Sequence, residues 1–332
     1  MLTDSYQRKH DYLRVSITDH CNLRCEYCMP PEGVELLSHD EVLRNEEFIR
    51  LIGIFVSLGV VKVRFTGGEP LLRRGFIDIV AAARDRFPDL ELCLTTNGTL
   101  LADFFPYLRR HRLRKLNISL DTLSRARYRK ITRRDCFENV IGSIDLALED
   151  PGFDVKINAV LSADTIAELD DFLEYFKDRN ASLRFIERMP FTAESGNGTF
   201  LPSDRLVEEL AARGELTRDR AIDTNVALMY RLMYRGRYPI RIGVIPPVSN
   251  KFCASCNRLR LMSNGNLKTC LHSETDHGLK ELMRGGADDA AIAREILAAV
   301  SQKHEGHRLE CRAGEGGCCA LVNTGCMSKI GG

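Results

Sequence analysis

The chain has 332 residues, of which 44% are apolar and 28% charged, and its 47 lysines and arginines nearly balance 46 aspartates and glutamates. This composition is typical of a globular enzyme that is long enough for a barrel with an appended region, and the near-zero net charge does not favour a nucleic-acid or membrane partner. No stretch approaches the roughly 18 apolar residues of a membrane span, and the first ten residues are polar, so we expect a cytoplasmic protein. In that compartment, the twelve cysteines are better explained as metal ligands and free thiols than as disulfides.

Over the first 190 residues, β-branched segments alternate with segments of helical periodicity. The predicted strands are residues 12–18, 61–65, 90–95, 116–120, 155–161 and 182–187. The predicted helices are one that follows a capping signal at Ser38 and Glu41, then 75–87, 101–111, 136–149 capped by Asp135, and 166–177. Six strands joined by crossovers of helix length predict a parallel sheet with right-handed connections. We therefore predict an α/β fold, an incomplete six-unit (βα) barrel over residues 1–190.

The regular alternation stops after residue 190. Residues 194–198 (ESGNG) are predicted to form a loop, and short helices are predicted at 203–212 and 292–302. We therefore expect residues 191–332 to form a separate C-terminal region that closes the side of the barrel.

Three cysteines lie on one short loop directly after the first predicted strand: Cys21, Cys25 and Cys28. A closed structural zinc site needs a fourth ligand, and the loop offers none at the usual spacing. A [4Fe-4S] cluster held by three thiolates keeps one iron open, and that iron can be chelated by S-adenosylmethionine (SAM). The spacing resembles the signature of the radical SAM superfamily. The alternative is three buried or zinc-binding cysteines.

The other predicted strands also end in unusual polar or glycine-rich sequences. In a parallel α/β barrel the working face lies at the C-terminal ends of the strands, so these sequences are predicted to meet there. They are residues 66–70 (TGGEP), 95–98 (TTNG), Asn117 with Ser119 and Asp121, Lys156 with Asn158 on one face of their strand, and Glu187 with Met189.

Five cations occupy four of the six predicted strands: Arg14, Lys62, Arg64, Lys156 and Arg184. A buried cation without a partner is costly, so cations that point into the barrel indicate an anion with several charges, such as a triphosphate. The alternative is that some face outward or pair with carboxylates such as Glu69 or Glu187. Two further basic clusters, at residues 109–115 and 125–134, are predicted to be solvated helix faces.

A second cysteine triplet comes late in the chain: Cys253, Cys256 and Cys270. It again provides three thiolates, which favours a second [4Fe-4S] cluster with one open iron. The alternative is a Cys3His zinc site completed by His272.

Together, the sequences CNLRCEYCMP, FTGGEPLLR, LTTNG, NISLD, FCASCNRLRL with Cys270, and the terminal MSKIGG resemble the GTP 3',8-cyclase family (molybdenum cofactor biosynthesis protein A) over essentially the whole chain. The resemblance implies that Cys21, Cys25 and Cys28 hold the SAM-binding cluster and that the second triplet holds a cluster whose open iron binds guanine. The implied SAM contacts are Tyr27, Gly68, Ser119 and Met189. The implied GTP contacts are Arg14, Lys62, Arg64, Thr95, Lys156, Arg184, Arg258, Leu259 and Arg260. The implied catalytic residues are Arg258, Arg260 and the terminal Gly331 and Gly332, a tail that reaches into the active site.

The resemblance also implies a reaction. A 5'-deoxyadenosyl radical removes hydrogen from C3' of GTP, the C3' radical attacks C8 of guanine, and an electron and a proton complete 3',8-cyclo-7,8-dihydro-GTP. The enzyme is then a lyase that catalyses the first step of molybdenum cofactor biosynthesis. Its implied partners are an electron donor and the synthase that makes cyclic pyranopterin monophosphate from the product. A homodimer is compatible with the resemblance, which leaves the oligomeric state open.

Two features depart from the family pattern. Arg188 stands where relatives usually carry an apolar or aromatic residue, and the tail carries Cys311, Cys318, Cys319 and Cys326, for which the family gives no role. Two other functions stay open at this point. A peptide-modifying radical SAM enzyme would use the tail cysteines for further clusters, and an iron-sulfur carrier or sensor would need neither an open iron nor the TGGEP sequence.

Overall fold

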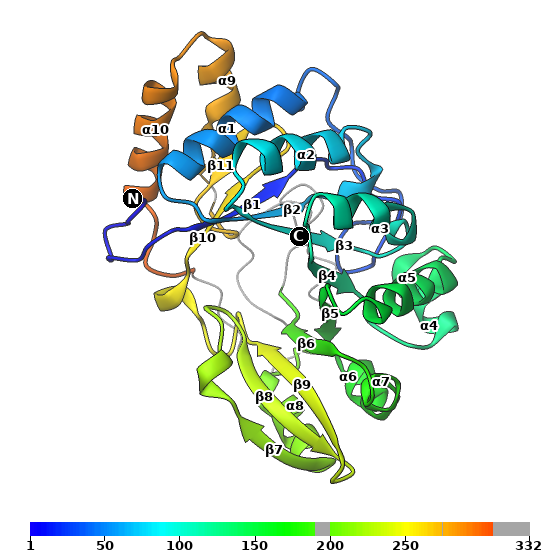
Figure 1. The fold of residues 1–332 in the computed structure, drawn as a ribbon. Helices are drawn as coiled ribbons and strands as arrows, with labels where there is room; N and C mark the ends of the chain where they lie inside the picture. Colours follow the sequence, from blue (N-terminus) through cyan, green and yellow to red (C-terminus); the bar gives the residue numbers. More distant parts are fainter. Residues whose placement is uncertain (190–199, 274, 308–332) are drawn as a thin grey trace.

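The computed structural model describes residues 1–189, 200–273 and 275–307. Within them, one 12-stranded sheet has the order β12-β11-β10-β1-β2-β3-β4-β5-β6-β9-β8-β7 (Figure 1). Its six central strands run parallel, and each lies within two residues of a predicted strand. They are β1 (Tyr12–Ser16), β2 (Lys62–Thr66), β3 (Glu91–Thr96), β4 (Lys115–Ser119), β5 (Asp154–Leu161) and β6 (Ala181–Glu187). The predicted parallel α/β arrangement is confirmed.

Helices connect these strands along one face of the sheet (Figure 1). They are α1 (Asn45–Ser57), the short η1 (Pro70–Leu72), α2 (Phe76–Arg86), α3 (Leu101–Arg110), α4 (Arg125–Thr132), α5 (Phe137–Glu149), α6 (Ala163–Ala167) and α7 (Leu169–Phe176). Helix α4 was not predicted, because its eight residues are mostly basic and lack a clear apolar period. The single helix predicted at 166–177 is instead two helices that meet at Glu168.

Two predicted helix starts were wrong. Glu41 does accept hydrogen bonds from Ser38, but this contact closes a turn, and α1 begins only at Asn45, where Glu47 accepts from the Arg44 backbone N–H at 2.7 Å. Asp135 does not cap α5, because its carboxylate pairs with Arg125 at 3.1 Å. The Ser38–Glu41 signal is thus a real local contact outside the helix, whereas the predicted cap at Asp135 does not form.

The C-terminal residues extend the same sheet at both of its edges, which the sequence did not reveal. Strand β9 pairs in parallel with β6, and β10 pairs in parallel with β1. The described elements of this part are α8 (Ser203–Ala211), β7 (Gly214–Arg218), η3 (Arg220–Ile222), β8 (Leu228–Tyr234), β9 (Tyr238–Ile245), η4 (Cys253–Ser255), β10 (Arg258–Leu261), β11 (Asn266–Lys268), β12 (His277–Gly278), α9 (Leu279–Arg284) and α10 (Asp289–Ser301). Helices α8 and α10 match the two predicted helices, and α10 begins three residues earlier, after a cap at Asp288. The predicted domain boundary lies among residues that the structure does not describe.

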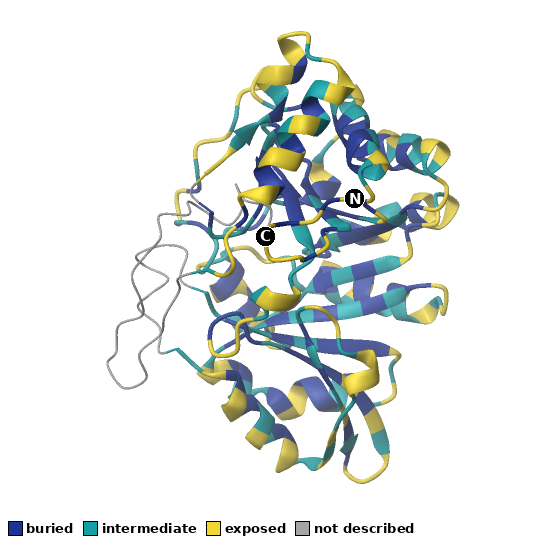
Figure 2. Ribbon diagram, turned by 90° about the vertical axis from the view of Figure 1, so that its left-hand side faces the viewer, coloured by how far each residue is buried: buried dark blue, intermediate teal, exposed yellow. Residues whose placement is uncertain are grey.

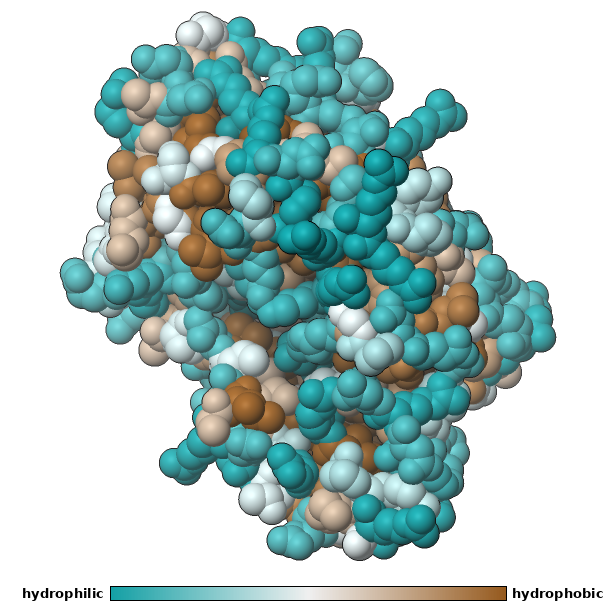
Figure 3. Space-filling model, viewed as in Figure 1, coloured by the Kyte–Doolittle hydropathy of each residue, from teal (hydrophilic) through white to brown (hydrophobic). Residues whose placement is uncertain are grey.

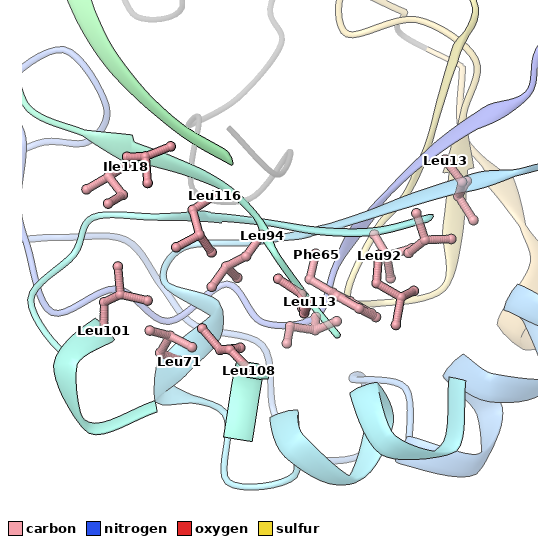
Figure 4. Close-up of a cluster of buried hydrophobic side chains, with 14 of the residues drawn as sticks. Leu13, Phe65, Leu71, Leu92, Leu94, Leu101, Leu108, Leu113, Leu116 and Ile118 are labelled. Carbon is pink, nitrogen blue, oxygen red and sulfur yellow. The ribbon is translucent and has the colours of Figure 1, made fainter. Parts of the chain in front are cut away.

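The main core lies between the helices and the outer face of the central strands. Figure 4 shows Leu13, Phe65, Leu94 and Leu116 pointing from their strands toward the helices. Phe76 of α2 packs edge-on against Phe65 with ring centroids 5.9 Å apart. Burying each such side chain stabilises the fold by about 1.5–3 kcal/mol. Figure 2 shows the same division, with the helices buried toward the sheet and exposed on their outer sides.

Alternate residues of the same strands face the other way, into the barrel, so the polar positions of each strand are collected on its inner face.

The molecular surface seen in Figure 3 is mostly hydrophilic with scattered apolar patches. In the part of the chain that the structure describes, no helix is long and apolar enough to cross a membrane.

Candidate active site

A cavity of about 670 Å³ opens at the inner face of the parallel strands. Its lining comes from β1 to β6, from β10, and from the loops that carry both cysteine triplets. Residues from nearly the whole length of the described chain therefore meet in one place. The predicted site residues that line it are Arg14, Cys21, Cys25, Tyr27, Cys28, Lys62, Arg64, Gly68, Thr95, Ser119, Lys156, Arg184, Met189, Cys253, Cys256, Arg258, Arg260 and Cys270.

The first cysteine loop is a tight turn against the strand ends. The backbone N–H of Cys28 donates to the carbonyl of Cys25 at 2.9 Å, and Arg24 donates to the carbonyl of Cys21 at 2.7 Å. Burial raises the pKa of Cys21 to about 11 and also raises that of Cys25, so the thiols keep their protons unless a metal replaces them. The donor set therefore fits a metal cluster that supplies positive charge to buried thiolates.

The two glycines after β2 let this loop approach. Gly67 has φ of +149°, and a Cβ atom there would lie 2.3 Å from the carbonyl oxygen of Thr18. A Cβ atom on Gly68 would lie 2.2 Å from the carbonyl oxygen of His20. The next residue, Glu69, accepts from the Asn97 backbone N–H at 2.7 Å, and burial raises its pKa to about 7. In this structure the glycines thus admit the cysteine loop itself.

Tyr27 connects the cysteine loop to the opposite side of the barrel. Its hydroxyl donates to Asp121 at 2.7 Å, and the other carboxylate oxygen of Asp121 accepts from the Val160 backbone N–H at 2.8 Å. Burial raises the pKa of Asp121, although these two hydrogen bonds oppose that effect. The loop is therefore held to β4 and β5 as well as to β2.

Positive charge dominates the cavity. Among its described lining residues, nine are arginine or lysine and only Asp121 and Glu187 are acidic. Both carboxylates are already used, since Glu187 accepts from the backbone N–H groups of Ser203 at 2.8 Å and Val248 at 3.0 Å. The nine basic residues are Arg14, Lys62, Arg64, Lys115, Lys156, Arg184, Arg188, Arg258 and Arg260.

The lysines and arginines of the cavity differ in their partners. Lys62 forms an ion pair with Glu91 at 2.6 Å, and Lys156 pairs with Asp154. Arg64 instead donates to the hydroxyl of Tyr12 at 2.6 Å. Lys62 and Lys156 are thus neutralised by carboxylates, which was the alternative to a bound anion. The carboxylates are Glu91 and Asp154 and not Glu69 or Glu187. The six arginines of the lining outnumber its two carboxylates, so the cavity keeps an excess of positive charge.

The second triplet lies on the same cavity, at the start of β10. The backbone N–H of Cys256 donates to the carbonyl of Cys253 at 3.2 Å. Burial raises the pKa of Cys256, but Lys303 and Arg258 outweigh that effect and lower it to about 7. Among the residues that the structure describes, no three His, Cys, Asp or Glu side chains are placed to hold a single metal ion, which does not favour the Cys3His zinc alternative with His272. The pKa of Cys256 near 7 suits a thiolate ligand.

Some predicted residues lie elsewhere. The Leu259 side chain is fully buried and absent from the cavity lining, because it lies between the inward positions of Arg258 and Arg260. Gly331, Gly332 and the four tail cysteines lie outside the described residues. Asn158 lines the cavity beside Lys156, as predicted. The sequence analysis missed two other lining residues, Tyr12 and Ile186. Each lies two residues from an inward arginine on the same strand, and that spacing was the available signal.

Comparison with known proteins bears on this site. The Radical SAM superfamily profile matches residues 15–176, and the Molybdenum Cofactor Synthesis C profile matches residues 181–309. GTP 3',8-cyclase of Mycolicibacterium smegmatis is 40% identical over 92% of this chain and 86% of its own length. The mitochondrial GTP 3',8-cyclase of Arabidopsis thaliana is 39% identical over 92% of this chain and 79% of its own length. The chain belongs to the GTP 3',8-cyclase family. The resemblance seen in the sequence motifs is confirmed.

Other matches differ in length or show the fold alone. Molybdenum cofactor biosynthesis protein 1 of Drosophila melanogaster is 41% identical over 92% of this chain, which spans only 54% of that protein. SuiB of Streptococcus suis bound to precursor peptide SuiA has a TM-score of 0.63 at 15% identity, over 90% of this chain and 68% of its own. This likeness supports an α/β barrel-type fold, and the Radical SAM superfamily match over residues 15–176 identifies that fold as the radical SAM type. As a member of this family, the chain is expected to use SAM and [4Fe-4S] clusters.

Proposed function

We propose that the chain is a GTP 3',8-cyclase, a lyase that makes 3',8-cyclo-7,8-dihydro-GTP in the first step of molybdenum cofactor biosynthesis. The observation that carries this proposal is one cavity lined by two cysteine triplets and by nine basic against two acidic residues. Two triplets suit two clusters, and the excess of cations suits a substrate with several negative charges. A triphosphate has that charge, and its nucleoside portion would extend toward the second triplet.

The first triplet, Cys21, Cys25 and Cys28, would hold the cluster that binds SAM. When bound there, the two groups supply the 5'-deoxyadenosyl radical. The chain's own contribution is placement. Tyr27, fixed by Asp121, orients the cysteine loop, while Gly68 keeps the loop backbone close to β2. The remaining proposed SAM contacts are Ser119 and Met189, which line the same cavity.

The second triplet, Cys253, Cys256 and Cys270, would hold a cluster that binds the guanine. The Arg258 and Arg260 side chains point into the cavity directly after this loop, so they can contact a substrate beside it. Leu259 can contribute only through its backbone, because its side chain belongs to the core. The proposed triphosphate contacts are Arg14, Lys62, Arg64, Thr95, Lys156 and Arg184.

Further parts of the proposal rest on the family resemblance. The chain is proposed to have two regions, residues 1–190 and residues 191–332. Its proposed partners are an electron donor and a synthase that uses the product. Gly331 and Gly332 are proposed to enter the site because a double glycine can thread where a side chain would clash. Deleting both should abolish cyclised product and leave the iron content unchanged. Product at the undeleted rate would contradict this role.

The direct test is anaerobic reconstitution followed by incubation with SAM, a reductant and GTP. Formation of 5'-deoxyadenosine together with 3',8-cyclo-7,8-dihydro-GTP would support the proposal. If 5'-deoxyadenosine forms without any product derived from GTP, the substrate assignment fails while the radical SAM assignment stands. Offering peptide substrates in parallel would then test the peptide-modifying alternative.

A further inference from the structure

A buried polar cluster lies behind the second cysteine triplet. It consists of Asp4, Arg8, His10 and Lys303, whose exposed fractions are 3%, 8%, 1% and 3%. None of the four lines the cavity, so none is in a position to touch the proposed substrate. Four ionisable groups at this depth are costly unless they compensate one another or serve a function. We refer to these four residues as the buried relay.

The first part of the relay fixes a histidine. The carboxylate of Asp4 accepts from Nε of Arg8 at 2.6 Å, and its Oδ2 lies 3.0 Å from Nε2 of His10. The other ring nitrogen, Nδ1, lies 3.4 Å from Nζ of Lys303. Because a lysine ammonium can only donate, Nδ1 of His10 must accept, and its ring proton is on Nε2, facing Asp4. His10 is therefore neutral and has one defined tautomer.

The second part of the relay reaches a cysteine of the triplet. Nζ of Lys303 donates to the Arg258 carbonyl oxygen at 2.9 Å and lies 3.6 Å from Sγ of Cys256. With Nδ1 of His10, these contacts use all three N–H groups of the ammonium. Lys303 is thus held in one position with one proton directed at a cysteine sulfur.

The charges of the relay do not cancel internally. Arg8 balances Asp4 and His10 is neutral, which leaves the positive charge of Lys303. The Cys256 sulfur is the group in contact with Lys303 that can supply a negative charge. Cys21 of the first triplet receives its side-chain hydrogen bond from the neutral amide of Asn97, at 3.8 Å. Cys256 therefore receives a hydrogen bond from a charged donor, whereas the donor to Cys21 is neutral.

Arg8 joins the relay to the loop backbone. Its guanidinium donates to the carbonyl oxygens of Cys253 at 2.8 Å and of His304 at 2.6 Å. The N-terminal segment, the second cysteine loop and the residues after α10 are thereby held together. This arrangement resembles a second ligand shell, in which a carboxylate and a histidine orient the group that contacts a metal ligand.

We propose that Lys303, held by His10 and Asp4, is a positioning residue that raises the reduction potential of the second iron-sulfur site through a charged N–H···S hydrogen bond to Cys256. The proposal rests on the proposed function, which assigns a cluster to this triplet. A positive charge and a hydrogen bond at a ligand sulfur stabilise the reduced cluster, which carries one more negative charge.

The test uses full-length chains in which Cys21, Cys25 and Cys28 are alanine, so that the cluster signal comes from one site. Four further variants are made in this parent, one at a time: Lys303→Met, Lys303→Arg, His10→Gln and Lys280→Met. Redox titration followed by electron paramagnetic resonance gives the midpoint potential of the parent and of each variant. Lys280 is the matched control, since it belongs to the same part of the chain and donates to the Glu41 carbonyl at 2.9 Å. We expect Lys303→Met to shift the midpoint potential to a more negative value. His10→Gln should shift it less in the same direction. Lys303→Arg should also give a smaller shift than Lys303→Met, because it keeps the positive charge. Lys280→Met should leave the midpoint potential unchanged.

Iron analysis separates the two possible failures. A parent without iron would contradict the second-cluster assignment of the proposed function. If the parent holds about four irons and its midpoint potential does not change when Lys303→Met is added, only the present inference is overturned. If Lys303→Met does not fold, an unchanged potential in His10→Gln overturns it as well. Loss of iron in Lys303→Met that Lys303→Arg prevents would support the role of the charge.

Discussion

Arg14 on β1 and Arg260 on β10 are register partners in a parallel strand pair, although they lie near opposite ends of the chain. Arg14 is also the register partner of Arg64 on β2. Burial and the charges of neighbouring arginines lower the pKa of Arg14 to about 10, and burial with Arg14 and Arg258 lowers that of Arg260 well below its ordinary value. The cavity therefore concentrates like charges at an electrostatic cost that a bound polyanion would relieve.

Replacing Arg260 with methionine should weaken GTP binding by about tenfold to a hundredfold, the range expected for one lost hydrogen bond to a charged group of about 1.5–3 kcal/mol. Isothermal titration calorimetry of the reconstituted protein would measure the change. Arg125→Met is the matched control, because Arg125 lies on the exposed face of α4 and pairs with Asp135. Equal affinities in both variants would contradict the proposed contact between Arg260 and GTP.

Replacing the second triplet, Cys253, Cys256 and Cys270, with alanine should halve the iron content from about eight to about four per chain. GTP turnover should be lost, while some SAM cleavage should remain because the first loop is intact. Iron and sulfide analysis with chromatography of 5'-deoxyadenosine measures both effects. Full iron content in the triple variant would show that the second cluster lies elsewhere.

The central strands were predictable because each carries a local signal, namely β-branched residues on one face and regularly spaced helices between them. Arg14 and Arg64 could be assigned to the cavity for the same reason, since residues two apart share a face of a strand. These predictions needed no knowledge of distant contacts.

The edge pairing was not predictable in this way. Strand β10 lies beside β1 because Leu259 and Leu261 complete the core next to Leu13 and Val15, a contact between residues far apart in the sequence. The buried relay was missed for a similar reason. Its members are single polar residues at the two ends of the described chain, and only the fold brings Lys303 to Cys256. Long-range contacts of this kind leave no periodic signal.

Arg188, which the sequence analysis singled out as a departure, lines the cavity. It lies on the inner face of the β6 end, four residues beyond Arg184, and its buried Nε has no hydrogen-bond partner among the described residues. Replacing it with methionine should stabilise the empty protein by on the order of 1 kcal/mol, because a buried donor without a partner is removed. SAM or GTP binding should weaken at the same time if the guanidinium contacts either ligand. Urea unfolding and calorimetry measure the two effects, and lower stability with unchanged binding would contradict both.

The last prediction concerns pH. Burial, and then the charge of Lys303, lower the pKa of His10 from 6.5 to about 4. Between these values the unfolded chain binds a proton that the folded chain does not, so stability is full above pH 6.5 and falls as the pH drops toward 4. The shift corresponds to a loss on the order of 3 kcal/mol.

Replacing His10 with glutamine should lower stability at pH 7 but reduce its decline between pH 6.5 and 4. The measurement is urea unfolding of the cluster-free chain at several pH values, which separates the slope from the overall loss. His20→Gln is the control, since the His20 side chain is 55% exposed and should not affect the slope. A slope that is equally steep in wild type and His10→Gln would show that His10 is not the buried neutral group on which the relay depends.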